Sequence, residues 1–203
     1  MPAVESLDQK LADIHADPHG SREFILADAK DADMWFGLPA TGREFNAPGR
    51  VPRVRSLADY RDQIREIVRQ GLVDIMLMST STSEVLTLRE RLFEDSPVTP
   101  AIRANDATDV HVMRGSRIPT QPARPFRTTL LDHAQCGHID CGPGERIAGA
   151  DLGLYSVTFN NDVQLDRETL EAYRAFREEA ERKGFRHFLE VFHPNVPGAV
   201  DPG

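Results

Sequence analysis

Short apolar segments alternate with segments of helical spacing along most of this chain, and this alternation constrains the fold more than any other feature. Hairpin signals are almost absent between the apolar segments. Such an order favours parallel strands joined by crossover helices, which is the arrangement of α/β proteins. The predicted strands cover residues 24–29, 72–79, 98–104, 151–159 and 186–192.

Two helices are predicted in the first third of the chain. Residues 5–15 have the spacing of a short amphipathic helix. Ser56, with Asp59 three residues later, forms a near capping box at the start of the second helix. Gly71 is a favourable C-terminal stop for that helix, because glycine readily adopts the left-handed conformation.

Two more helices are predicted after the second strand. Ser81 and Glu84 form a capping box, and Pro97 ends the helix that follows. Asp166 is the expected N-cap of the last helix, which ends at Gly184.

We expect one domain over residues 1–203, because this length suits a single sizeable core. Residues 37–55 carry Gly, Pro and Arg without a regular period and are predicted to be a loop. Residues 107–149 also have little periodicity. A segment of that length inside a compact domain is usually a lid, a binding loop or disordered. We therefore expect a long irregular insertion or lid over 107–149.

Charge and composition narrow the classes of function. The chain has 24 basic and 32 acidic residues, and its net charge of -8 argues against nucleic acid as the main partner. No apolar stretch approaches the roughly 20 residues needed to cross a bilayer. The N-terminal segment lacks the apolar core of a signal peptide, and two cysteines provide no disulfide framework. We expect a cytoplasmic protein with a small-molecule substrate and no membrane contact.

Polar side chains near the strand ends predict a pocket. Side chains alternate along a strand, and in a barrel one face looks into the lumen while the other packs on helices. A charge on the helix-facing side would be buried without water, so charged positions are taken to mark the lumen. On this reasoning a mixed-charge pocket is formed by Asp28, Lys30, Arg103, Asn105, Thr158, Asn160 and Glu190.

The residue types of this predicted pocket suit a small polar anion or carbonyl compound. Arg103 is the candidate ligand for a carboxylate or phosphate, and Asp28 and Glu190 are candidates for proton transfer. Lys30 would be an amine nucleophile if it were desolvated beside another cation. Two alternatives stay open: Lys30 pairs with a neighbouring aspartate, and Glu190 pairs with the basic residues that begin its own strand.

A cluster of cysteine and histidine residues occupies positions 133–141. His133, Cys136, His138 and Cys141 are all possible zinc ligands. The spacing Cys-x-His-x-x-Cys is not a common zinc-finger pattern, and four ligands within nine residues would strain to surround one metal ion. We expect a polar loop with incidental cysteines, and we predict no metal and no cofactor.

Four segments carry a resemblance to a known family: ILADAKDADMWFG, IRANDATDV, GADLGLYSVTFNND and FRHFLEVFHPN. Together they resemble a bacterial family with the aldolase-type TIM barrel, related to class I aldolases of the deoxyribose-phosphate and archaeal fructose-bisphosphate type. The resemblance covers residues 20–195. It implies a (β/α) barrel with the site at the carboxyl ends of the strands, and Schiff-base chemistry on a sugar-phosphate-like carbonyl compound. Asp28 matches the first-strand acid of such aldolases.

The chain departs from this family in one respect. The Schiff-base lysine of such aldolases lies on the sixth strand, whereas only five strands are recognised here. The lysines of this chain are Lys10, Lys30 and Lys183, and none matches that position. No Schiff-base role is therefore transferred. We expect a barrel truncated to about five βα units, or an open sheet whose edges are covered by a partner such as a second copy in a homo-oligomer.

Three functional hypotheses follow. The first is an aldolase-like lyase that acts on a small phosphorylated or carboxylated carbonyl compound. The second is a catalytically degenerate barrel that binds a small anionic ligand without turnover. The third is a metalloprotein that uses the loop of His133, Cys136, His138 and Cys141.

Overall fold

The fold is built on a sheet of five parallel strands. A computed structural model describes residues 4–34, 38–45, 53–110, 117–142, 144–146 and 148–200. The strand order β1-β4-β5-β8-β9 places each strand beside the one before it in the sheet, and all four pairings are parallel. The strands are β1 (Ala27–Lys30), β4 (Ile75–Met78), β5 (Thr99–Arg103), β8 (Leu152–Thr158) and β9 (Arg186–Phe192).

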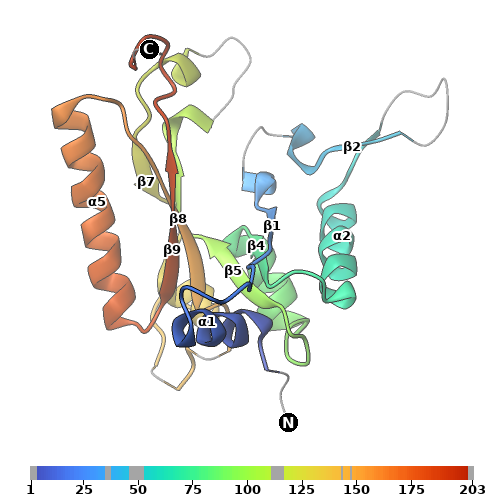
Figure 1. The fold of residues 1–203 in the computed structure, drawn as a ribbon. Helices are drawn as coiled ribbons and strands as arrows, with labels where there is room; N and C mark the ends of the chain where they lie inside the picture. The colour runs from blue at the N-terminus through green and yellow to red at the C-terminus, as the bar shows by residue number, and fades with distance from the viewer. Residues whose placement is uncertain are drawn as a thin grey trace.

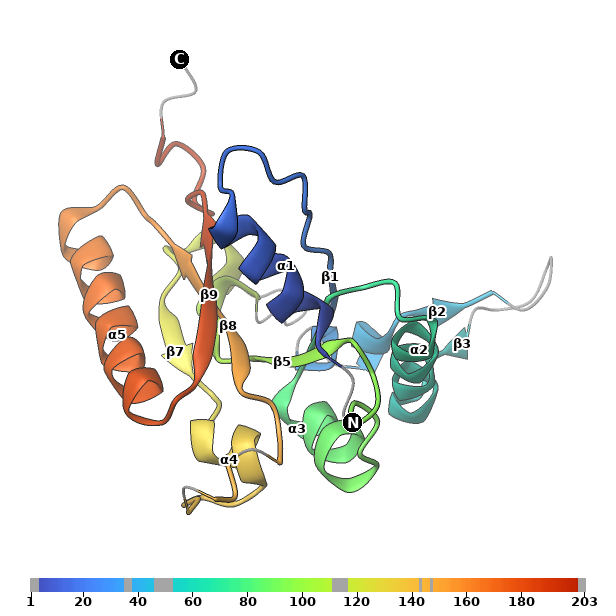
Figure 2. The same ribbon diagram turned by 60° about the horizontal axis from the view of Figure 1, so that its bottom comes forward.

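The sheet curls into a half-barrel with helices on its convex side (Figure 1). This arrangement confirms the predicted α/β class and the parallel, crossover-linked strands. One helix differs from the others, because it lies across the amino-terminal end of the concave side (Figure 2). That helix is α1 (Ser6–Ala16), and the others are α2 (Leu57–Gln70), α3 (Thr80–Ser83), the π-helical η3 (Glu84–Arg89), α4 (Leu131–Cys136) and α5 (Val163–Arg182).

Two small antiparallel pairs lie outside the main sheet, in segments that the sequence predicted to be irregular. The first pair is β2 (Arg43–Glu44) with β3 (Arg53–Val54). The second is β6 (Asn105–Ala107) with β7 (Pro125–Arg127), so the prediction of an irregular segment over 107–149 is wrong in part. Residues 111–116, 143 and 147 of that segment lie outside the described residues. Short 3-10 turns complete the connections: η1 (Ala32–Met34), η2 (Leu38–Thr41), η4 (Thr108–Val110) and η5 (Ile118–Thr120).

The limits of α2 follow local signals. The Ser56 hydroxyl accepts a hydrogen bond from the Asp59 backbone N–H at 3.1 Å, and the Asp59 carboxylate accepts one from the Ser56 N–H at 2.8 Å. This reciprocal pair is the predicted capping box. Gly71 ends the helix with φ of 63°, a left-handed value that glycine adopts without a Cβ clash.

Two other predicted helix starts are wrong. Ser79 caps α3 in place of Ser81, because it directly follows the buried strand β4 and accepts from the Thr82 N–H at 3.2 Å. Asp162 caps α5 in place of Asp166, so that helix begins one turn earlier than predicted.

The core has one apolar layer on each side of the sheet. On the concave side, Leu7 of α1 packs against Ile75, Leu77 and Leu154 of the sheet. On the convex side, the helices bury two larger clusters, centred on Met76 and Met78 of β4 and on Tyr155 and Val157 of β8. Burial of a large apolar side chain contributes about 1.5–3 kcal/mol, so these layers hold the helices on the sheet. Within the described residues, no helix combines the length and apolarity that a membrane crossing requires.

Candidate functional site

The strand register assigns the side chains of the sheet to two faces. Partners in register face the same side, since side chains alternate along each strand. One face carries Asp28 and Lys30 with Met76 and Met78. The other, concave face carries Ala27, Ala29, Ile75, Leu77, Thr99, Ala101, Arg103, Leu152, Leu154, Ser156, Thr158, Arg186, Phe188, Glu190 and Phe192.

Asp28 and Lys30 lie on the convex face, so their predicted place in the lumen is wrong. Lys30 Nζ lies 2.9 Å from Asp28 Oδ1, and both side chains are partly exposed. β1 is the last strand on one side of the sheet, and this edge position lets convex charges reach water. The assumption that a helix-facing charge must be buried therefore fails here. The alternative prediction, that Lys30 pairs with a neighbouring aspartate, is confirmed.

Asp31 is the acidic residue that reaches the concave side, and sequence reasoning missed it. It lies one residue beyond β1, is buried, and pairs with Arg103 through a contact of 3.1 Å between Oδ2 and Nη1. Burial raises the pKa of Asp31, whereas the charge and hydrogen bond of Arg103 lower it. Asp31 lies two residues after Ala29, and side chains two residues apart along a strand point to the same face. This spacing is the sequence signal that could have identified Asp31.

Arg103 is held in place from several sides. Its Nε donates a hydrogen bond of 2.9 Å to the Asn105 carbonyl, and its side chain is almost fully buried. The Thr129 hydroxyl donates to the Arg103 carbonyl at 3.0 Å. These contacts orient the guanidinium at the carboxyl end of β5, where a ligand of the concave face would meet it.

Asn105 has a structural role instead of the predicted ligand-binding role. Its Oδ1 accepts from the Ser156 N–H at 2.7 Å, and its Nδ2 donates to the Ser156 carbonyl at 2.8 Å. The side-chain amide thus replaces a peptide group in the ladder between the end of β5 and β8. Both ends of the amide are occupied by backbone, so its predicted ligand role is not supported.

Glu190 lies on the concave face beside Ser156, its register partner in β8. The Ser156 hydroxyl donates to Glu190 Oε2 at 3.0 Å. Arg186, at the start of the same strand, pairs with Asp8 and Asp151 and not with Glu190. His187, the other basic residue at the start of β9, shares a hydrogen bond with the Tyr173 hydroxyl at 3.0 Å. Among the described contacts neither residue pairs with Glu190, so the alternative that Glu190 pairs with a basic residue of its own strand is wrong.

Thr158 and Asn160 lie at and beyond the end of β8. Thr158 is buried on the concave face, opposite Phe192 in register. Asn160 is also buried, and its Nδ2 donates to the Ala123 carbonyl at 3.1 Å. This bond ties the segment before β7 to the end of β8. Neither residue contributes to the cleft that contains Arg103 and Glu190.

The concave face contains a cleft of about 460 Å³. Its polar side chains are Asp31, Arg103 and Glu190, which meet there from three strands or strand ends. The remaining wall is apolar and includes the concave side chains of Ala27, Ala29, Leu77, Leu154, Phe188 and Phe192. The structure thus brings together two of the predicted residues and adds Asp31. One guanidinium and two carboxylates in an apolar wall can bind a small anion and exchange protons with it.

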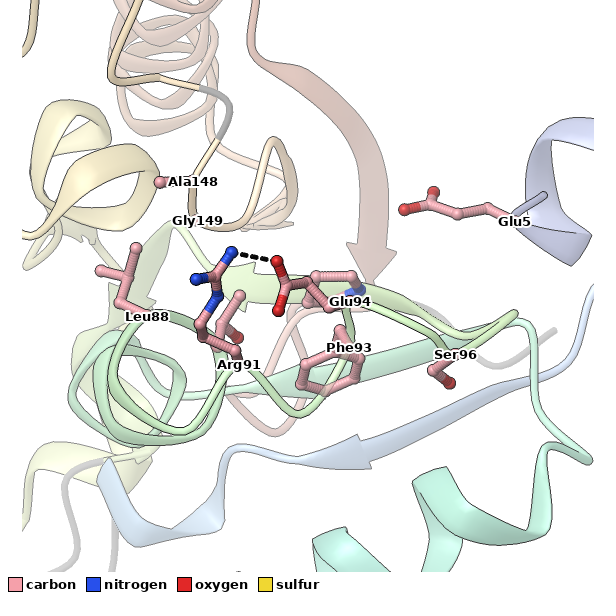
Figure 3. Close-up of a pocket in the computed structure, with 10 residues that line it drawn as sticks. Glu5, Leu88, Arg91, Phe93, Glu94, Ser96, Ala148 and Gly149 are labelled. Atoms are coloured by element: carbon pink, nitrogen blue, oxygen red, sulfur yellow. Dashed lines mark hydrogen bonds and ion pairs between the residues drawn. The ribbon is translucent and has the colours of Figure 1, made fainter. Parts of the chain in front are cut away.

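A second cleft, of about 540 Å³, lies near the amino-terminal ends of β5 and β8 (Figure 3). Its lining includes Glu5, Arg91, Glu94 and Gly149, and Arg91 pairs with Glu94 within it. None of the sequence-predicted site residues lines this cleft. In parallel α/β sheets, ligand sites are found at the opposite, carboxyl-terminal ends of the strands. We therefore assign the candidate site to the concave cleft.

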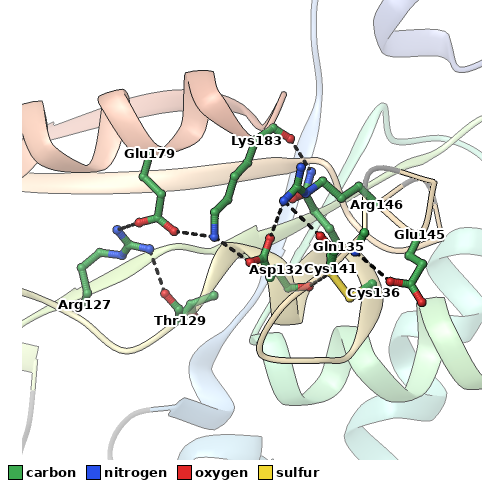
Figure 4. Close-up of polar contacts among 11 residues, drawn as sticks. Arg127, Thr129, Asp132, Gln135, Cys136, Cys141, Glu145, Arg146, Glu179 and Lys183 are labelled. Carbon is green, nitrogen blue, oxygen red and sulfur yellow. Dashed lines mark hydrogen bonds and ion pairs between the residues drawn. A yellow bond between two sulfur atoms is a disulfide. The ribbon is translucent and has the colours of Figure 1, made fainter.

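The cysteine cluster forms a disulfide between Cys136 and Cys141, so the prediction of incidental cysteines is wrong (Figure 4). Beside this bond, Asp132 pairs with Lys183 at 2.8 Å and with Arg146 at 3.3 Å. Burial alone would raise the pKa of Asp132, but these two cations outweigh it and hold the pKa below its ordinary value. These pairs join α4 to the end of α5 and to the loop before β8. In the part of the chain that the structure describes, no three metal-ligating side chains converge.

Comparisons with protein-family models, with curated proteins and with solved structures found no match to this chain. The fold and the site together define an α/β half-barrel with a mixed-charge cleft on its concave face. Its function is argued below from that cleft.

Proposed function

We propose that the concave cleft binds a small organic anion that carries a carbonyl group. The observation that carries this proposal is the convergence of Arg103, Asp31 and Glu190 in one largely apolar cleft. The Arg103 guanidinium has five N–H donors, so it can bind a carboxylate or phosphate while Asp31 holds it. The apolar wall excludes water around the ligand, which strengthens charged hydrogen bonds.

The two carboxylates suit proton transfer beside a carbonyl group. Burial raises the pKa of Asp31 while Arg103 lowers it, so this carboxyl group is placed to take up and return a proton beside a carbonyl oxygen. Glu190 receives a hydrogen bond from Ser156 and is the candidate base on the facing strand. In this proposal the protein is an aldolase-like lyase, which polarises a carbonyl group with one acid and moves a proton with the other.

The sequential strand order supports an aldolase-type TIM barrel as the parent architecture. Such a barrel closes when its parallel strands continue around the lumen, and its site then lies at the carboxyl ends of the strands. The site proposed here has that location. We therefore include in the proposal both a closed parent barrel and the relation to class I aldolases that the sequence resembles.

Binding without turnover is the second candidate, and the positions of the lysines favour it. Lys10 pairs with Asp74, Lys30 pairs with Asp28, and Lys183 pairs with Asp132. These are all the lysines of the chain, and none lines the concave cleft. An imine on a lysine of this chain is therefore not part of the proposed chemistry.

Ligand-dependent stabilisation tests the binding proposal. We expect one or more compounds from a panel of 2-keto acids and sugar phosphates to raise the melting temperature. At 100 times the dissociation constant, binding adds about 2.7 kcal/mol, which corresponds to about 5–11 °C for a chain of this size. Arg103→Lys should weaken this binding, whereas Arg91→Lys in the second cleft should not. A panel without effect, or loss of binding only in Arg91→Lys, contradicts the proposal.

Turnover separates the two candidates. Glu190→Gln can still accept the Ser156 hydrogen bond but cannot act as a base. A lyase should lose carbon–carbon bond cleavage in this variant and keep ligand binding. Binding without cleavage in the unaltered protein supports the second candidate. Borohydride trapping with a bound keto compound should label no lysine of this chain, and a labelled lysine would contradict the proposed chemistry.

A further inference from the structure

β9 is the last strand on one side of the sheet, and its outer edge is apolar. Among the described residues no strand pairs with that edge, which runs from Arg186 to Phe192. Leu189, Val191 and Phe192 are exposed, Val191 to 55% of its surface. Apolar side chains on both faces are typical of a strand inside a parallel sheet, and natural edge strands usually carry lysine, proline or bulges instead.

β1 forms the other edge, with the Asp28–Lys30 pair on its convex side and apolar residues before it. Phe24 and Leu26 lead into it, and Phe24 is 71% exposed. On the concave side the edge carries only the small side chains of Ala27 and Ala29. The edge of β1 is thus narrow on the side where β9 carries Phe188 and Phe192.

The two edges border the same cleft. Ala27 and Ala29 of β1 line it together with Phe188 and Phe192 of β9. At the amino-terminal end of the strands, α1 covers the concave side of the sheet. Its residue Leu11 packs against the same apolar cluster as Phe188 of β9. The carboxyl-terminal half of β9 is the part that remains available.

We propose that a second copy of this chain covers both edges, with β9 of each copy parallel to β1 of the other. A two-fold rotation about an axis that runs along the cleft keeps the strands parallel and gives every edge strand of both copies a hydrogen-bonding partner. The large side chains of β9 then lie beside the small ones of β1, and the exposed leucines of both edges become buried. An antiparallel contact of β9 with β9 would leave both β1 edges open. The proposed dimer also closes the open side of the concave cleft.

The oligomeric state over a roughly hundredfold range of protein concentration tests this inference. Sedimentation equilibrium should show a dimer that dissociates on dilution. Val191→Lys, which places a charge on the edge, should raise the dissociation constant about tenfold or more. Leu170→Lys is the matched control, because Leu170 is 50% exposed on the helix α5 and belongs to neither edge strand. A monomer at every concentration overturns the proposal, as does equal weakening by both variants.

Disulfide trapping tests the direction of the contact. Leu189 lies on the convex side of β9, Asp28 lies on the convex side of β1, and Leu26 comes two residues before Asp28, so cysteines there can meet in a parallel contact. Leu189→Cys protein mixed with Leu26→Cys or Asp28→Cys protein should form a mixed dimer on oxidation. A cross-link of Leu189→Cys with itself, or none with either β1 variant, overturns the parallel arrangement. These readouts do not involve the ligand, so they can fail or succeed independently of the proposed function.

Discussion

Loss of the Arg103 guanidinium should produce a large and pH-dependent loss of stability. Arg103 and Asp31 are 3% and 7% exposed in their side chains, so the pair is shielded from water. Removing one partner of a buried pair leaves an uncompensated charge and typically costs about 3–5 kcal/mol. For a chain of this size, that loss lowers the melting temperature by about 6–20 °C. Urea unfolding of Arg103→Met at neutral pH measures the free energy directly.

The sign of the pH dependence follows from Asp31. Burial raises its pKa above the ordinary value of 3.8, and Arg103 opposes that rise. Without Arg103, the pKa of Asp31 in the folded state is higher still. A carboxyl group whose folded pKa is raised binds more protons in the folded state, so its contribution to stability increases as the pH falls. The deficit of Arg103→Met should therefore be largest at neutral pH and smaller at about pH 5.

A second substitution and a surface control complete this test. Asp31→Asn in the Arg103→Met background removes the isolated charge, so it should restore most of the lost stability at neutral pH. Arg174→Gln breaks an exposed pair with Glu178 and should change stability by less than about 1 kcal/mol. A loss below about 1 kcal/mol in Arg103→Met, a deficit that does not depend on pH, or no rescue by Asp31→Asn would refute the reasoning.

Three further predictions concern the scaffold. Asn105→Ala leaves a backbone N–H and carbonyl of β8 without their partners, so urea unfolding should show a loss of roughly 2–6 kcal/mol; a loss no larger than that of the Arg174→Gln control would contradict its structural role. Gly71→Ala should cost about 1 kcal/mol at the left-handed end of α2, whereas Gly144→Ala, with nothing near its Cβ, should cost less; equal melting temperatures would argue against the cap. Reduction of the Cys136–Cys141 bond should cost about 2 kcal/mol in chemical denaturation, and a double serine variant that still responds to the reductant would show that the effect lies elsewhere.

The strand and helix order could be predicted because its signals are local. The capping box at Ser56 and the stop at Gly71 each depend on contacts within one turn of helix, and both are confirmed. Strand β9 has the predicted limits, because its apolar run is bounded by breakers on both sides. The caps of α3 and α5 were misplaced because several candidate capping residues lie within a few positions of each other.

The site could be predicted only in part. Arg103 and Glu190 lie in the same cleft, since alternation along a strand is a property of the backbone. Asp28 and Lys30 were assigned to the wrong face because the solvent access of a convex side chain depends on whether its strand is an edge. That condition is set by the order of strands in the sheet, which no local signal contains.

By itself, the sequence determined the α/β class, the direction of the strands and the local limits of several elements, because periodicity and caps act over a few residues. Only the tertiary structure decided that Asp31 and Arg103, 72 residues apart, form a buried pair that lines the cleft. It also decided that Asn105 is occupied by the backbone of β8 and that the two cysteines are bonded. The physical reason is that burial and hydrogen-bond partners depend on which distant segments are brought together, whereas alternation and capping do not.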